Sequence, residues 1–229
     1  MIAIIINGVT ASLGALLGFF LKRGISEKYT KTIFGVISLC VAIMGIQSAV
    51  QSQNLLLVLA SFIVGTLLGT IIGIEDRMQQ FGEFLKRRMQ RPGEDNTFVK
   101  GFVTLSVMQV VGALAILGPI QAALGSNDLL YFKSVLDFTS AFIFGTIYGL
   151  GVVPVGLVNL VYEAFFFLLA SFFMPLMTPD VIRELNAVGG VMILGIALNM
   201  FRVTELKVAD FLPALFIPIL YYHLFGGLL

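Results

Sequence analysis

Long apolar stretches alternate with short polar ones along the whole chain, and this pattern predicts a bundle of membrane helices. A transmembrane helix needs about 20 mostly apolar residues to cross the hydrocarbon core of a bilayer. Eight stretches approach that length, so we expect an all-α protein with about eight transmembrane helices. The stretches cover residues 3–21, 33–50, 55–74, 101–118, 134–152, 155–174, 187–201 and 210–227. The seventh is short and contains Gly189 and Gly190, which should loosen its helix. A helix broken beside a cavity and a helix kinked for packing are the two alternatives.

Composition supports a lipid-solvated protein and excludes several functions. Hydrophobic residues form 58% and charged residues 12% of the 229 residues, whereas a soluble domain has about 25% charged residues. The net charge of +1 argues against nucleic-acid binding. A single cysteine and a single histidine exclude cysteine-based metal clusters and most nucleophile–base pairs. No phosphate-binding loop or dinucleotide motif is present, so we expect no enzyme activity, cofactor or metal centre.

Basic residues predict the orientation, because lysine and arginine concentrate in cytoplasmic loops. Ten of the 14 basic residues fall in the loops 22–32 and 75–100. Lys133 and Arg183 are expected to lie alone in loops on the opposite side. Eight spans with both termini outside fit this distribution.

The loop 75–100 has a pattern of its own. Four apolar residues between Met78 and Leu85 share one helical face, and the other side is basic. This pattern predicts a short amphipathic helix that contacts lipid headgroups. The headgroup contacts are assigned to Lys86, Arg87 and Arg88. A basic anchor without lipid recognition is the alternative. Residues 91–97 are the only linker-like stretch, where we place the boundary between two halves.

A shift of 152 positions aligns residues 5–50 with a later segment without a gap. Asn7 then meets Asn159, and Gln47 meets Asn199. The two copies enter the membrane from opposite sides, which predicts an inverted repeat typical of secondary transporters. A chance alignment of apolar sequences is the alternative.

The predicted organisation is one membrane domain, 1–229, in four parts. A first three-helix repeat (1–74) is followed by the cytoplasmic loop (75–100), two intervening helices (101–152) and a second, inverted repeat (153–229). Ser26 in the first repeat and Thr178 in the second are each expected to cap the helix that follows.

Polar residues inside the apolar stretches are the candidate site. A carboxylate at the depth of Glu163 costs about 2.5–3.5 kcal/mol on insertion scales. Asn159 lies one helical turn earlier on the same face, so both are predicted to line an ion or solute pathway. Glu163 would exchange a proton or bind a cation, whereas a hydrogen-bonded structural contact is the alternative. Asp137 can pair with Lys133, which favours a structural role. The full predicted pathway set is Glu163, Asn159, Asn7, Asn199, Gln47, Asp137 and Gln109.

Several segments carry a family resemblance. They are residues 69–85, 101–116, 133–137, 187–199 and 211–215. On these segments the chain resembles the YdfK/YqgA-like bacterial membrane proteins, a family of unknown function (domain of unknown function 554). The resemblance covers nearly the whole length and implies a multi-pass protein of the bacterial inner membrane. It supplies no catalytic residues, but it raises the interest of Asp137 and Asn199.

Two functional hypotheses follow. The first is a small secondary transporter or channel that moves an ion or small polar solute through a polar site near the midplane. The second is a non-transporting scaffold or assembly partner that acts through its basic cytoplasmic loop. The expected partners are the lipid bilayer and an ion or small solute. A homodimer formed through a glycine-rich helix face is also plausible.

Overall fold

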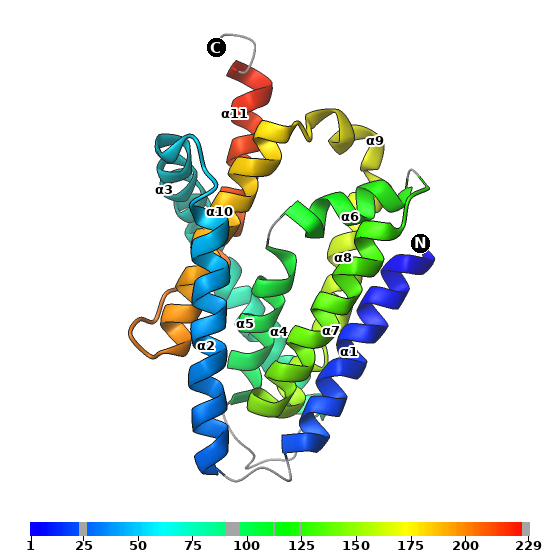
Figure 1. Ribbon diagram of the computed structural model, residues 1–229, viewed down its shortest axis with the longest axis vertical. Coiled ribbons are helices and arrows are strands. Elements are labelled where there is room, and N and C mark those ends of the chain that lie inside the picture. The colour runs from blue at the N-terminus through cyan, green and yellow to red at the C-terminus, as the bar shows by residue number, and fades with distance from the viewer. Residues whose placement is uncertain (23–26, 90–96, 112, 124, 226–229) are drawn as a thin grey trace. The chain divides into compact units, whose positions relative to one another are not determined.

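The computed structural model describes residues 1–22, 27–89, 97–111, 113–123 and 125–225. Nearly all of them are helical, and no strand occurs among them, which confirms the all-α prediction (Figure 1). A helix satisfies its backbone polar groups internally, as a lipid environment requires. The elements are α1 (Ile2–Lys22), α2 (Glu27–Ala49), α3 (Leu55–Ile72), α4 (Ile74–Met89), α5 (Thr97–Val110), α6 (Ala113–Ala123), α7 (Asp128–Tyr148), η1 (Gly149–Val152), α8 (Val155–Leu168), α9 (Ala170–Phe173), η2 (Met174–Leu176), α10 (Pro179–Met200), η3 (Val208–Phe216) and α11 (Ile217–Phe225).

Helices suited to a membrane account for most of the described chain. Five segments are long and apolar enough to cross a bilayer, or up to seven if each of two bent helix pairs is one span. One pair is α5 and α6, which meet at 60°. The Ser38–Ala49 part of α2 is a shorter apolar helix. The count of eight spans and the inverted repeat therefore stay predictions.

Four helices begin at least four residues before their apolar stretches. α2 starts at Glu27, α5 at Thr97, α7 at Asp128 and α10 at Pro179. Polar residues occupy these first turns because helix starts need caps and acceptors for unpaired N–H groups. The Thr178 side chain accepts a hydrogen bond from Val181 N at 3.3 Å, which confirms this predicted cap. Ser26, the other predicted cap, lies outside the described residues. α4, with 16 residues, is longer than the predicted short helix. Of the predicted linker 91–97, only Thr97 lies within the described residues.

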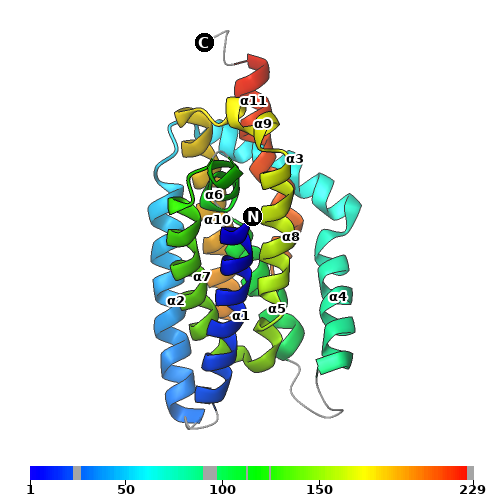
Figure 2. The same ribbon diagram turned by 90° about the vertical axis from the view of Figure 1, so that its right-hand side faces the viewer.

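The chain forms two compact units that interleave along the sequence. The first unit comprises residues 1–34, 76–110 and 114–170, and the second comprises residues 35–75, 111–113 and 171–229. Each unit takes helices from both predicted repeats. The predicted division into four parts stays a prediction. In the first unit α1 lies between α7 and α8 (Figure 2). Glycines bring these helices together: a Cβ at Gly18 would lie 2.0 Å from Phe142 O of α7.

The second unit packs α2, α3, α10, η3 and α11. α3 lies against η3 so closely that a Cβ at Gly69 would be 1.9 Å from Asp210 O. α2 meets α10 at Gly45, where a Cβ would lie 2.9 Å from Gly190 O. The predicted break in the seventh stretch is wrong, because α10 continues unbroken through Gly190. That glycine serves close helix packing instead.

Candidate functional site

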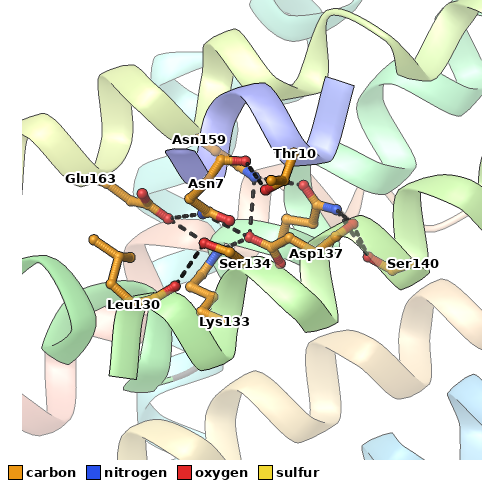
Figure 3. A network of polar contacts seen from close by, with 10 residues as sticks. Asn7, Thr10, Leu130, Lys133, Ser134, Asp137, Ser140, Asn159 and Glu163 are labelled. Carbon is orange, nitrogen blue, oxygen red and sulfur yellow. Dashed lines mark hydrogen bonds and ion pairs between the residues drawn. The ribbon is translucent and has the colours of Figure 1, made fainter. Parts of the chain in front are cut away.

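Six polar side chains from four helices of the first unit converge in one buried cluster (Figure 3). α1 contributes Asn7, α5 Gln109, α7 Lys133 and Asp137, and α8 Asn159 and Glu163. None of the six is more than 5% exposed. We call this set the polar cluster. It contains five of the seven residues that the sequence predicted for a pathway.

Helix geometry explains why these side chains meet. Lys133 and Asp137 are four residues apart on α7, and Asn159 and Glu163 are four apart on α8, so each pair occupies one face. α1 approaches α8 at the residue after Asn7, where a Cβ on Gly156 would lie 2.0 Å from Gly8 O. A short amide side chain on α1 therefore reaches both faces.

An ion triad forms the centre of the polar cluster. Lys133 Nζ donates to Asp137 Oδ2 and lies 3.2 Å from Glu163 Oε1. Asn7 Nδ2 donates to Asp137 Oδ2 at 3.0 Å and also to Glu163 Oε1. The lysine and the asparagine thus bridge two carboxylates that come from different helices (Figure 3).

Neutral amides extend the polar cluster toward α5. Asn159 Nδ2 donates to Gln109 Oε1 at 2.6 Å and to Asp137 Oδ2 at 3.2 Å. Gln109 Nε2 donates to Asp137 O and to Ser140 Oγ, both at 2.9 Å. Asp137 Oδ2 therefore accepts from three side chains, whereas each Glu163 oxygen has fewer donors. Asp137 is the carboxylate with more hydrogen-bond donors.

The charges of the polar cluster do not balance. One lysine against two carboxylates leaves a formal charge of −1 when all three are ionised. Three buried acceptor oxygens of the polar cluster also have no hydrogen-bond partner within the described part of the chain, namely Asn7 Oδ1, Asn159 Oδ1 and Glu163 Oε2. Buried polar atoms normally have hydrogen-bond partners. The unpartnered acceptor oxygens and the net negative charge of the polar cluster therefore suit the binding of one positively charged species.

Gln47 and Asn199, the other two predicted pathway residues, belong to the second unit. The Gln47 side chain is exposed. Asn199 closes the turn after α10: its Nδ2 donates to Leu206 O at 2.7 Å, and its Oδ1 accepts from Leu206 N and Thr204 Oγ1 at 2.8 Å. These bonds give the Asn199 amide a local structural task.

Lys133 is the residue that sequence reasoning misplaced. The prediction put it in an outside loop, but it lies inside α7 and is 4% exposed. Arg183, also expected in a loop, lies within α10. The prediction ended each apolar stretch at a charged residue. An ion pair, however, can keep a charged side chain within a helix. The spacing of four residues to Asp137 was the available signal.

The predicted headgroup residues lie near the end of α4. Arg87 and Arg88 are exposed, and Lys86 is half-buried. The Arg88 guanidinium lies 5.3 Å from the centre of the Phe84 ring, and that ring is also exposed. Phe81 packs edge-on against Phe102 of α5, which holds α4 to the first unit. The helix therefore presents basic and aromatic side chains together.

A buried carboxylate in the second unit gives a useful contrast. Glu184 of α10 is fully buried and accepts from Ser52 Oγ at 2.5 Å and from Gln53 N at 2.9 Å. Its Oε1 also lies 3.4 Å from Arg183 Nε. Each Glu184 oxygen has a donor, so this group ties the connection between α2 and α3 to α10. Glu163 differs because its Oε2 has no hydrogen-bond donor among the described residues.

Comparisons with known proteins place the chain in a family. A family model described as "Protein of unknown function (DUF554)" matches residues 2–223. The chain is 28% identical over 235 residues to the uncharacterized membrane protein YdfK of Bacillus subtilis (strain 168), covering 99% of each protein. It is 25% identical over 215 residues to the uncharacterized protein YqgA of Escherichia coli (strain K12), covering 92% of this chain and 91% of YqgA. No solved structure matches the chain. The protein belongs to the DUF554 family, as its sequence resemblance predicted.

Proposed function

We propose that this protein is a small secondary transporter of the bacterial inner membrane. An ion or small polar solute would cross at the polar cluster, with Glu163 exchanging a proton or a cation. The observation that carries the proposal is a set of three ionisable side chains, Lys133, Asp137 and Glu163, buried together in a membrane helix bundle.

Stability alone does not account for such a cluster. A charged side chain within a membrane helix costs about 2.5–3.5 kcal/mol on insertion scales, and ionisable residues there commonly mark ion pathways. Replacing a buried ion network by apolar side chains is often neutral or stabilising. The imbalance of charge at Glu163 also distinguishes the polar cluster from structural contacts such as those of Glu184, whose oxygens all have donors.

Helix contacts support the inverted repeat on which alternating access would depend. In the predicted repeat α1 corresponds to α8, α2 to α10, and α3 to the last span formed by η3 and α11. Each pair packs directly through small residues. The contacts are Gly8 with Gly156, Gly45 with Gly190, and Gly65 with Ala214. Within each unit taken by itself, contact between corresponding helices is what a twofold axis in the membrane plane produces near that axis.

α4 supports a second role at the membrane surface. Its exposed Arg87 and Arg88 beside exposed Phe84 suit the headgroup region of an anionic leaflet. We place this helix and the loop 75–100 on the cytoplasmic side, with both chain termini outside. A scaffold or assembly partner acting through α4 alone is the alternative function. In that case neutral substitutions in the polar cluster would leave activity intact.

Reconstitution tests the proposal directly. The full chain would be placed in proteoliposomes that contain a pH-sensitive dye. Gradients of Na+, K+ and a panel of small amino acids and carboxylates would be imposed while internal pH and labelled solute are followed. We expect flux above protein-free liposomes, with a loss of at least about tenfold in Glu163→Gln and Asn159→Ala.

Matched controls come from exposed positions. Glu205→Gln removes an exposed carboxylate, and Gln53→Ala removes an exposed amide side chain. Both should keep wild-type flux. Absence of flux for every gradient in the panel would remove the transporter proposal. Equal flux in wild type and in both cluster variants would remove the polar cluster as the pathway.

A further inference from the structure

We infer that the polar cluster binds one alkali-metal cation, Na+, through oxygens of Asn7, Asn159 and Glu163. The inference rests on the proposed function, because it takes the polar cluster as the transport site and names its coupling ion. It begins from three buried oxygens that have no hydrogen-bond partner among the described residues: Asn7 Oδ1, Asn159 Oδ1 and Glu163 Oε2.

The two amides cannot turn around to satisfy these oxygens. Asn7 Nδ2 donates to two carboxylates, and Asn159 Nδ2 donates to Gln109 Oε1 and Asp137 Oδ2. A flipped amide would point its oxygen at a carboxylate oxygen, which is repulsive. Both amide nitrogens already donate hydrogen bonds. The amide oxygens of Asn7 and Asn159 therefore require a cation or a hydrogen-bond donor.

The oxygens are of the type that hard cations prefer. Carboxylate and amide carbonyl oxygens bind ions of the alkali and alkaline-earth class rather than soft metals. The formal charge decides between these classes. One monovalent cation brings the sum of Lys133, Asp137 and Glu163 from −1 to 0, whereas a divalent cation would leave +1 in a buried site.

Lys133 sets this valence. Its ammonium group is held on Asp137 Oδ2 and lies 3.2 Å from Glu163 Oε1, so it acts as a tethered cation that already neutralises one carboxylate. Only the second carboxylate remains for a mobile ion. Without Lys133 the site would have a charge of −2 and would suit a divalent cation instead.

The groups around Glu163 leave its second carboxylate oxygen to a cation. Lys133 of α7 lies 3.2 Å from Glu163 Oε1, and the neutral Asn7 of α1 donates to the same oxygen. Both donors therefore contact Oε1, and Oε2 has no donor among the described residues.

Direct binding tests the inference independently of flux. The purified full chain in detergent would be titrated with 22Na+ in a scintillation proximity assay at pH 8. We expect saturable binding. Glu163→Gln should weaken it by at least about tenfold, while Glu205→Gln should not. Unlabelled Ca2+ should fail to displace 22Na+ from wild type but should occupy Lys133→Met.

Folding of the variants is followed by helicity and gel filtration. If Glu163→Gln does not fold, Glu163→Asp keeps the charge but withdraws the carboxylate, and it should weaken binding without abolishing it. No saturable 22Na+ binding to wild type, or equal binding in Glu163→Gln, would overturn the inference. So would equal displacement by Ca2+ in wild type. Flux without Na+ binding refutes this inference but leaves the proposed function standing, whereas Na+ binding without any flux refutes transport alone.

Discussion

Removing the Lys133 ammonium should destabilise the first unit more than any other single change in the polar cluster. Lys133→Met keeps the approximate length of the side chain and removes its charge. Asp137 and Glu163 then remain as two buried carboxylates bridged by one asparagine amide. Neither can reach water while the helices stay packed, since both are at most 5% exposed.

The structure indicates the size of the effect. Breaking a buried ion pair by removing one partner costs about 3–5 kcal/mol. For a chain of this size about 1 kcal/mol corresponds to roughly 2–4 °C in melting temperature, so the variant should melt about 6–20 °C below wild type. Asp137 keeps two amide donors, from Asn7 and Asn159, but Glu163 keeps only one. The uncompensated Glu163 carboxylate should therefore cause most of the loss of stability.

This difference between the two carboxylates can be tested with a double variant. Adding Glu163→Gln to Lys133→Met restores the charge of the cluster to −1 and should recover at least about 1 kcal/mol. The chain has no tryptophan, so melting is best followed by circular dichroism in detergent. Lys100→Met, at an exposed position, is the matched control and should melt as wild type does. A Lys133→Met melting point within about 2 °C of wild type, or no recovery in the double variant, would refute the reasoning.

Other predictions test the packing, the turn and the orientation. Gly156→Ala places a methyl group 2.0 Å from a backbone oxygen of α1, so it should lower the stability of the protein by about 1–3 kcal/mol or more. Gly35→Ala is the control, because a Cβ there has no atom within 4 Å, and it should leave stability unchanged. Thermal melting measures both variants. Asn199→Ala breaks the turn after α10 and should lower the melting temperature by several degrees while flux persists; lost flux in a folded variant would show that Asn199 belongs to the pathway. A membrane-impermeant maleimide should label Arg87→Cys, in a Cys40→Ser background, only after the inner membrane is permeabilised. Labelling of intact spheroplasts would contradict a cytoplasmic α4.

The helical architecture was predictable because few backbone structures satisfy their own hydrogen bonds in lipid. Each apolar stretch corresponds to a helix or to a helix pair, since backbone groups in hydrocarbon must bond within their own segment. The shared face of Asn159 and Glu163 also followed from their spacing. The Thr178 cap was readable from its position before an apolar run. These are local properties, and local sequence determines them.

The composition of the polar cluster depended on packing between distant segments. Asn7 meets Asp137 and Glu163 only because α1 lies between α7 and α8. Hydropathy excluded Lys133 because it scores a charge by itself and not by its partner. The repeat alignment found Gln47 and Asn199 but could not show that one is exposed and the other closes a turn.

Charge movement tests the central claim, that the polar cluster exchanges one positive ion across the membrane, most directly. Proteoliposomes adsorbed on a solid-supported membrane would receive rapid jumps of Na+ concentration or of pH, and the transient current would be recorded. We predict a saturable current in wild type and in Glu205→Gln and none in Glu163→Gln. A wild-type trace identical to that of protein-free liposomes, or an unchanged current in Glu163→Gln, would contradict the account.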